Sequence, residues 1–249
     1  MSEIDLPDTK RLLWTEMRAD LVKYVPWFAD NELLLCPICC RALKFEQFSL
    51  EHVIPQQAVN SDPLEVRQAI SKGQRSGLTL LCKETIIVDG KSFPNGCNGW
   101  KGRHFDKKIG ETLRLGGMPR HFSNVHLIAF LMVGYLGLFL RYGYRVALVE
   151  SGLVLRNQFF NPTRFTKQMP TTSQMVLCGE PIKSLDSTSH SYWSDPVKIV
   201  VTGRKATIVI RNYSVMLTLS EDPNIPLAIH LAYVPRRHAF RADLRLAFT

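Results

Sequence analysis

The sequence predicts an α+β protein, and three observations lead to that class. Helical periodicity and long apolar runs, at 9–25, 98–117 and 125–142, alternate with short runs of β-forming residues. Several of these short runs flank turn-forming residues, as the strands of hairpins do. The chain has 249 residues, of which 45% are hydrophobic, so it can bury a sizeable core.

The first eighty residues are expected to form a helix followed by short strands. In TKRLLWTEMRADLVKYV (9–25) the apolar residues fall on one stripe, and Pro26 follows the end. FEQFSLEHVIP (45–55) and LTLLC (78–82) have the composition of strands. The polar stretch between them, 60–76, is expected to be a loop with a short helix.

A hairpin is predicted where Asp89-Gly90 joins IIV to KSF, because this dipeptide suits a tight type I′ turn. A hairpin returns the chain to its starting point, so Cys82 and Cys97 are expected to be neighbours. The segment 98–117 that follows is expected to be a helix.

A change in character near residue 120 indicates two domains, 1–120 and 121–249. The second domain begins with an apolar helix at 125–142, whose run LIAFLMVGYLGLFL is shorter than a bilayer requires. We therefore expect a buried helix and no membrane association. The sequence after it is expected to be rich in strands, which are YRVALVE, GLVLRNQFF, SQMVLC, the hairpin VKIVV-TGRK-ATIVI, YSVMLTLS and PLAIHLAYV.

The charge distribution favours a polyanionic partner. The formal net charge is +9, and the basic surplus begins after residue 100. Nucleic acid is the expected partner of such a surface, although ordinary solubility charge would look the same. The polar N-terminus MSEIDLPDTK has no secretory signal, so a cytoplasmic protein is expected.

The cysteines are spaced as metal ligands. In a reducing compartment, thiols are more often ligands or free groups than disulfides. Four thiolates in a tetrahedron are typical of structural Zn²⁺, although buried free cysteines are the simpler alternative. The predicted zinc ligands are Cys36, Cys39, Cys82 and Cys97. Cys40 could replace one of them, and Cys178 is expected to be a core residue.

The order CPIC, EHVIP, LTLLC and CNGWKG over residues 33–113 resembles the HNH endonucleases, whose core is the ββα-metal fold. The resemblance implies a zinc knuckle beside an active site that hydrolyses DNA phosphodiester bonds. It implies His52 as general base, with Glu51 and Asn98 holding a catalytic Mg²⁺ or Mn²⁺. Such a site needs a base with a pKa near neutrality and a hard cation near the phosphate.

The helix after Cys97 carries further features of the resemblance. Gly102 and Asp106 match a subgroup with glycine and an acidic residue on this helix, and His104 is an alternative metal ligand. Basic residues on the helix are expected to contact the DNA backbone, or else to form a solvated helix face. They are Lys101, Arg103, Lys107 and Lys108.

Two alternatives stay open. Ser76-Gly77 stands where the family carries its middle asparagine, so the chain could be a zinc-stapled nucleic-acid-binding protein with a degenerate nuclease site. Residues 121–249 could bind DNA, or could bind a protein partner in a defence or mobile-element system.

Overall fold

In the computed structural model, the residues described are 6–59, 77–113, 124–149, 173–177, 197–210 and 213–226, with the single positions 152, 156, 159 and 160. Four predicted features lie outside them, namely the helix within 60–76, Ser76, Cys178 and nearly all of the strand PLAIHLAYV.

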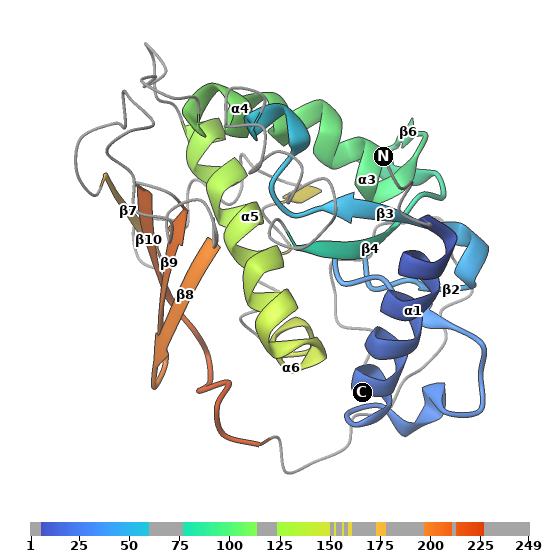
Figure 1. The fold of residues 1–249 in the computed structure, drawn as a ribbon. Coiled ribbons are helices and arrows are strands. Elements are labelled where there is room, and N and C mark those ends of the chain that lie inside the picture. The colour runs from blue at the N-terminus through green and yellow to red at the C-terminus, as the bar shows by residue number, and fades with distance from the viewer. Residues whose placement is uncertain are drawn as a thin grey trace.

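The described residues form the α+β protein that the sequence predicts (Figure 1). The α-helices are α1 (Leu6–Val22), α3 (Gly96–Lys101), α4 (Lys107–Leu113), α5 (Asn124–Tyr142) and α6 (Tyr144–Ala147). The strands are β1 (Leu34–Leu35), β2 (Ala42–Leu43), β3 (Phe48–His52), β4 (Leu78–Cys82), β5 (Ile86–Val88), β6 (Lys91–Phe93), β7 (Ser173–Leu177), β8 (Val197–Thr202), β9 (Lys205–Ile210) and β10 (Tyr213–Thr218). Short turns of helix are η1 (Pro26–Phe28), η2 (Phe45–Gln47), η3 (Gln56–Val59) and the π-helical turn η4 (Gly102–Asp106).

The ladder β3–β4 is antiparallel and carries the candidate site. Its register pairs Phe48 with Cys82 and Glu51 with Thr79. Helix α1 packs against β4, and Trp14 of α1 meets Phe48 edge-to-face with ring centroids 5.6 Å apart. Helix α3 also contacts β4, so two strands and the following helix pack together.

The hairpin β5–β6 forms where it is predicted. Asp89 and Gly90 both have positive φ, 49° and 77°, which a type I′ turn requires. The chain then turns into α3 through Asn95 and Gly96, which also have positive φ. The expected helix after Cys97 is continuous to Leu113, but η4 interrupts its α-helical pattern between α3 and α4.

Helix α5 lies between the β3–β4 ladder and a four-stranded antiparallel sheet of order β7-β10-β9-β8 (Figure 1). Glycines on α5 allow the sheet to approach, because a Cβ at Gly134 would lie 2.8 Å from Ile208 Cδ1. A Cβ at Gly137 would lie 3.0 Å from Val197 Cγ1. The helix is buried as expected. The expectation that its apolar stretch is too short for a bilayer is wrong, because the window 125–142 is long and apolar enough to cross one. It is the one such stretch among the described residues, and 72% of it is buried.

One expected strand contains a helix instead, and the described positions of a second are helical. YRVALVE contains α6, where the backbone N–H of Tyr144 donates to Asp20 Oδ2 at 2.7 Å. That contact with α1 stabilises the helix N-terminus and outweighs the β-forming composition. In GLVLRNQFF the described positions are helical as well, and the guanidinium of Arg156 donates to the carbonyl of Ala147 at the end of α6.

A single cluster of buried side chains extends over both halves of the chain. The Tyr135 hydroxyl on α5 donates to the carbonyl of Pro37 at 2.6 Å, and the Tyr144 hydroxyl donates to the carbonyl of Leu35. The elements after residue 120 therefore pack directly on the cysteine-bearing segment, and the domain boundary near 120 stays a prediction.

Candidate active site and metal centre

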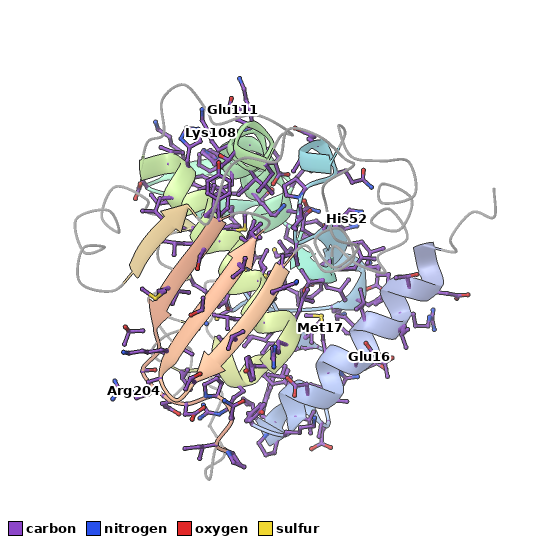
Figure 2. All side chains as sticks on the ribbon, turned by 60° about the vertical axis from the view of Figure 1, so that its left-hand side comes forward. Glu16, Met17, His52, Lys108, Glu111 and Arg204 are labelled. Atoms are coloured by element: carbon purple, nitrogen blue, oxygen red, sulfur yellow. The ribbon has the colours of Figure 1, made fainter. Side chains whose placement is uncertain are left out.

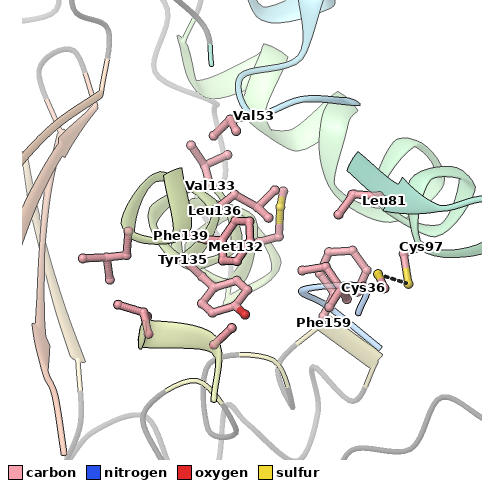
Figure 3. Close-up of a cluster of buried hydrophobic side chains, with 14 of the residues drawn as sticks. Cys36, Val53, Leu81, Cys97, Met132, Val133, Tyr135, Leu136, Phe139 and Phe159 are labelled. Atoms are coloured by element: carbon pink, nitrogen blue, oxygen red, sulfur yellow. Dashed lines mark hydrogen bonds between the residues drawn. The ribbon is translucent and has the colours of Figure 1, made fainter. Parts of the chain in front are cut away.

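Three cysteine thiols meet in the interior beside the end of the β3–β4 ladder. The Sγ atoms of Cys36, Cys39 and Cys97 all lie within 4.8 Å of one another, and all three residues are buried. Figure 3 shows Cys36 and Cys97 facing each other, and their Sγ atoms are 3.9 Å apart. That separation is far longer than a disulfide bond. This buried cluster could hold a metal ion such as zinc.

Cys82 lies next to this cluster. Its backbone N–H donates to Cys36 Sγ at 3.5 Å. Hydrogen bonds with Cys39 and Cys97 lower the pKa of the Cys82 thiol to about 4, with a smaller contribution from the charge of Arg41. Arg41 is buried, with Nη1 3.9 Å from Cys82 Sγ and 3.0 Å from the Thr85 carbonyl oxygen. Arg41 was not singled out from the sequence, although its place directly after CPICC is a usable signal.

The protonation of the cluster fits a metal site. Burial raises the pKa of Cys36, but hydrogen bonds with Cys39 and Cys97 outweigh it, so the pKa lies well below its usual value. Burial raises the pKa of Cys39 and of Cys97. These shifts favour the thiolate form at Cys36 and Cys82 and the thiol form at Cys39 and Cys97. A dication would supply the missing positive charge, and thiolates are the form that binds zinc.

Gly96 brings Cys97 to the cluster. Its φ is +55°, and a Cβ there would lie 2.3 Å from the carbonyl oxygen of Cys82 and 2.6 Å from that of Glu84. The backbone before α3 thus approaches the end of β4 more closely than any side chain permits. Cys40, the possible substitute ligand, is buried with φ of 54° and is not part of the three-thiol cluster.

A second cluster, here called the Lys101 triad, lies where β3 meets the helix after Cys97. It consists of Lys101, Glu51 and Asp106. The Lys101 ammonium is 2.5 Å from Glu51 Oε1 and 2.7 Å from Asp106 Oδ1. The Lys101 side chain is 0% exposed, and the Glu51 side chain is 11% exposed. Burial raises the pKa of Glu51 more than the charge of Lys101 lowers it.

The π-helical turn η4 explains why Lys101 and Asp106 meet. Residues five apart lie on different sides of a regular α-helix, where neighbours on one face are three or four apart. A π turn has its hydrogen bonds from residue i to i+5, which brings such residues toward the same face. The turn begins at Gly102 and ends at Asp106. The Lys101–Asp106 contact was not foreseen, because the sequence here predicts an ordinary helix.

Asn98 is used to hold strand β3. Its amide Nδ2 donates to Ser49 Oγ at 2.8 Å and to the carbonyl of Leu50 at 3.2 Å. These bonds fix α3 against the residues just before Glu51. The backbone N–H of Val53, directly after His52, donates to the carbonyl of Gly77 at 3.1 Å. Hydrogen bonds therefore fix the backbone both before and after the Glu51-His52 pair.

His52 ends β3 and is partly exposed (Figure 2). Its Nε2 lies 3.1 Å from Gln56 Nε2. An amide nitrogen only donates, so Nε2 of His52 is the acceptor in this pair and carries no proton. Burial, and secondarily the charge of Lys101, lowers the pKa of His52 below 6.5. This shift favours the neutral imidazole, which is the form able to accept a proton.

The basic residues of the helix separate into two kinds. Lys101 differs from the expected surface contact, because its ammonium is buried in the triad. Arg103 and Lys107 are exposed, and Lys108 is partly exposed with its ammonium 2.9 Å from Glu111 Oε2. Figure 2 shows Lys108 and Glu111 together on α4. Lys107 also lies 4.0 Å from Glu111 Oε1, and the Arg103 guanidinium lies 5.7 Å from the Phe93 ring centroid.

His104, the alternative metal ligand, packs against Trp100. Its ring stacks on Trp100 with centroids 3.9 Å apart, and its Nδ1 lies 2.9 Å from the Trp100 carbonyl oxygen. The Trp100 indole donates in turn to the carbonyl of Phe159 at 2.5 Å. Trp100 joins this helix to the segment near residue 159, a link that the sequence did not reveal.

The predicted ligands of a catalytic Mg²⁺ or Mn²⁺ are both engaged otherwise. Glu51 already pairs with an ammonium, and the Asn98 amide is bonded to β3. The residues as they stand therefore fit a structural metal at the cysteines but do not fit a divalent ion between Glu51 and Asn98.

A scan against protein-family models found no match, and neither the curated proteins nor the solved structures gave one. The resemblance to HNH endonucleases accordingly depends on the residues of this chain alone.

Proposed function

We propose that the chain is an HNH-type endonuclease that hydrolyses phosphodiester bonds in DNA, with His52 as general base. One observation carries the proposal. A neutral, partly exposed imidazole ends an antiparallel strand beside a buried carboxylate–lysine cluster, and a helix bearing exposed Arg103 and Lys107 packs on the same ladder. These are the groups that phosphodiester hydrolysis requires, namely a base, positive charge and a hold on the backbone.

In this proposal the cysteines have a structural role. A Zn²⁺ bound by Cys36, Cys39 and Cys97, with Cys82 as the fourth ligand, would fasten the start of α3 to the end of β4. That connection sets the distance between the helix and the Glu51-His52 pair. A zinc ion with four protein ligands has no open position, so it would take no part in the reaction.

His52 would act through its Nε2. Once Gln56 turns aside, this nitrogen accepts a proton from a water molecule whose oxygen attacks phosphorus. The bond from phosphorus to the leaving oxygen breaks, and that oxygen takes a proton from solvent. The lowered pKa of His52 favours the unprotonated base. The exposed Arg103 and Lys107 on the following helix would offset the developing negative charge.

A second candidate is a zinc-stapled DNA-binding protein that does not cut. Two observations favour it. Glu51 is already neutralised by Lys101. In addition, Gly77, at the position of the family's middle asparagine, offers only its backbone carbonyl to the segment after His52.

Supercoiled plasmid separates the two candidates. The purified chain is incubated with plasmid alone, with Mg²⁺, with Mn²⁺ and with EDTA, while binding to the same DNA is followed by gel shift. The nuclease proposal predicts relaxed or linear product under at least one of these conditions. Binding without product under all four would support the second candidate.

A further inference from the structure

We infer that the Lys101 ammonium occupies a cation position between Glu51 and Asp106, and that a divalent cation binds this carboxylate pair only when Lys101 leaves it. The inference deepens the proposed function, on which it rests in taking Glu51 as a cation-binding group. The two carboxylates hold the ammonium at 2.5 and 2.7 Å, and no second cation fits between the same oxygens at these distances.

The charges of the triad favour exchange for a dication. The Glu51 and Asp106 side chains are 11% and 15% exposed, and two carboxylates against one ammonium leave an uncompensated negative charge with little access to water. A hard divalent ion in place of the ammonium would balance both carboxylates. It would also accept oxygen ligands, which Glu51 and Asp106 supply.

A third oxygen lies on the same face of the ladder. Thr79 pairs directly with Glu51 across the strands, so their side chains project to the same side. Thr79 is 1% exposed, and its Oγ1 has no hydrogen-bond partner among the described residues. A buried hydroxyl without a partner is costly. A cation beside Glu51 would satisfy it.

The side chain of Lys101 can leave the site without unfolding the helix. Lys101 is the last residue of α3 and directly precedes the π turn, where the α-helical pattern is already interrupted. Its long, flexible side chain can therefore change position while the helix stays folded. Asn98 holds the ladder independently of the triad through Ser49 and the Leu50 carbonyl. Glu51 therefore keeps its backbone position whichever cation it binds.

Mn²⁺ binding to the full chain, measured by calorimetry without DNA, tests the inference. Lys101→Met should bind Mn²⁺ about tenfold or more tightly than the parent, because no ammonium–carboxylate bond then has to break. The matched control is Lys23→Met, which removes a lysine from a surface pair with Asp20 and should leave the affinity unchanged. The double variant Lys101→Met, Asp106→Asn should lose the gain, which assigns it to the triad and not to the cysteines.

Equal or weaker Mn²⁺ binding by Lys101→Met would overturn the inference. If that variant does not fold, amine acetylation of the parent, followed by mass spectrometry, gives the same decision. Mn²⁺ should increase labelling of Lys101 relative to Lys23, and unchanged labelling would contradict the exchange. The calorimetry contains no DNA, so its result does not depend on the nuclease proposal. Failure of that proposal would appear in the plasmid assay, as a chain that binds Mn²⁺ but does not cut.

Discussion

Lys101 affects more of the candidate site than any other single residue described above. The sequence predicts it as one of four basic residues facing DNA, yet its ammonium is buried between Glu51 and Asp106. At that position it neutralises one carboxylate and excludes a second cation from the same oxygens, and its charge adds to the burial that lowers the pKa of His52. Its neighbours Arg103 and Lys107 keep the expected surface position.

The cluster of buried cysteines leads to a direct prediction about zinc content. The purified chain should contain about one zinc per molecule, and Cys39→Ser should lose most of it, because the Cys39 Sγ lies within 4.8 Å of two other thiols. Cys40→Ser is the matched control. It removes the adjacent thiol, which is outside the cluster, and should keep the zinc. Elemental analysis decides, and a Cys39→Ser protein with full zinc content would exclude this cluster as the site.

Among the elements, the turn before α3 controls the site most directly. Gly96→Ala should destabilise the fold by more than the ~1–3 kcal/mol expected for a non-glycine residue at positive φ. The added Cβ would also collide with the Cys82 carbonyl, at 2.3 Å. Gly90→Ala is the matched control, because Gly90 also has positive φ but a Cβ there meets nothing within 4 Å.

Chemical denaturation and zinc content of the two glycine variants provide the comparison. We expect Gly96→Ala to be the less stable variant and to bind zinc poorly. Gly90→Ala should lose only the stability that a non-glycine residue at positive φ costs. Equal stability of the two proteins would mean that the approach of Gly96 to β4 is unimportant.

An element could be predicted from the sequence when the residues that stabilise it are neighbours in the chain, and could not when they are distant. The hairpin β5–β6 was predictable because Asp89 and Gly90 supply its turn locally. Helix α6 was not, because the cap at Tyr144 comes from Asp20, 124 positions away. In the site, the spacing of the cysteines predicted the cluster of Cys36, Cys39 and Cys97, while Cys82, the fourth predicted ligand, lies next to it. The π turn that joins Lys101 to Asp106 has no comparable sequence signal.

For the whole molecule, α5 is the element that joins the two halves. Figure 3 shows its side chains, among them Tyr135, Leu136 and Phe139, in the core near the cysteines. The Tyr135 hydroxyl donates to the carbonyl of Pro37, which stands between two of the clustered cysteines. The C-terminal half is thus part of the support of the metal site, whatever further partner it binds.

Tyr135→Phe tests that support. It leaves the buried carbonyl of Pro37 without this donor, which should cost about 1–3 kcal/mol of stability, and it should speed zinc loss to a chelator. Tyr142→Phe is the matched control, because the Tyr142 hydroxyl makes a long, exposed contact of 3.4 Å with Asn224. Unchanged stability and zinc retention in Tyr135→Phe would argue against the coupling of α5 to the metal site.

The cleavage rate of His52→Ala, measured beside DNA affinity in the same samples, tests the central claim most directly. Loss of a general base typically lowers the rate ~10²–10⁴-fold. The variant should therefore bind DNA like the parent and cut it far more slowly. His104→Ala removes a ring that stacks on Trp100, and this variant should cut at the parental rate. If His52→Ala cut as fast as the parent, His52 would not be the base and the account of this site would be wrong.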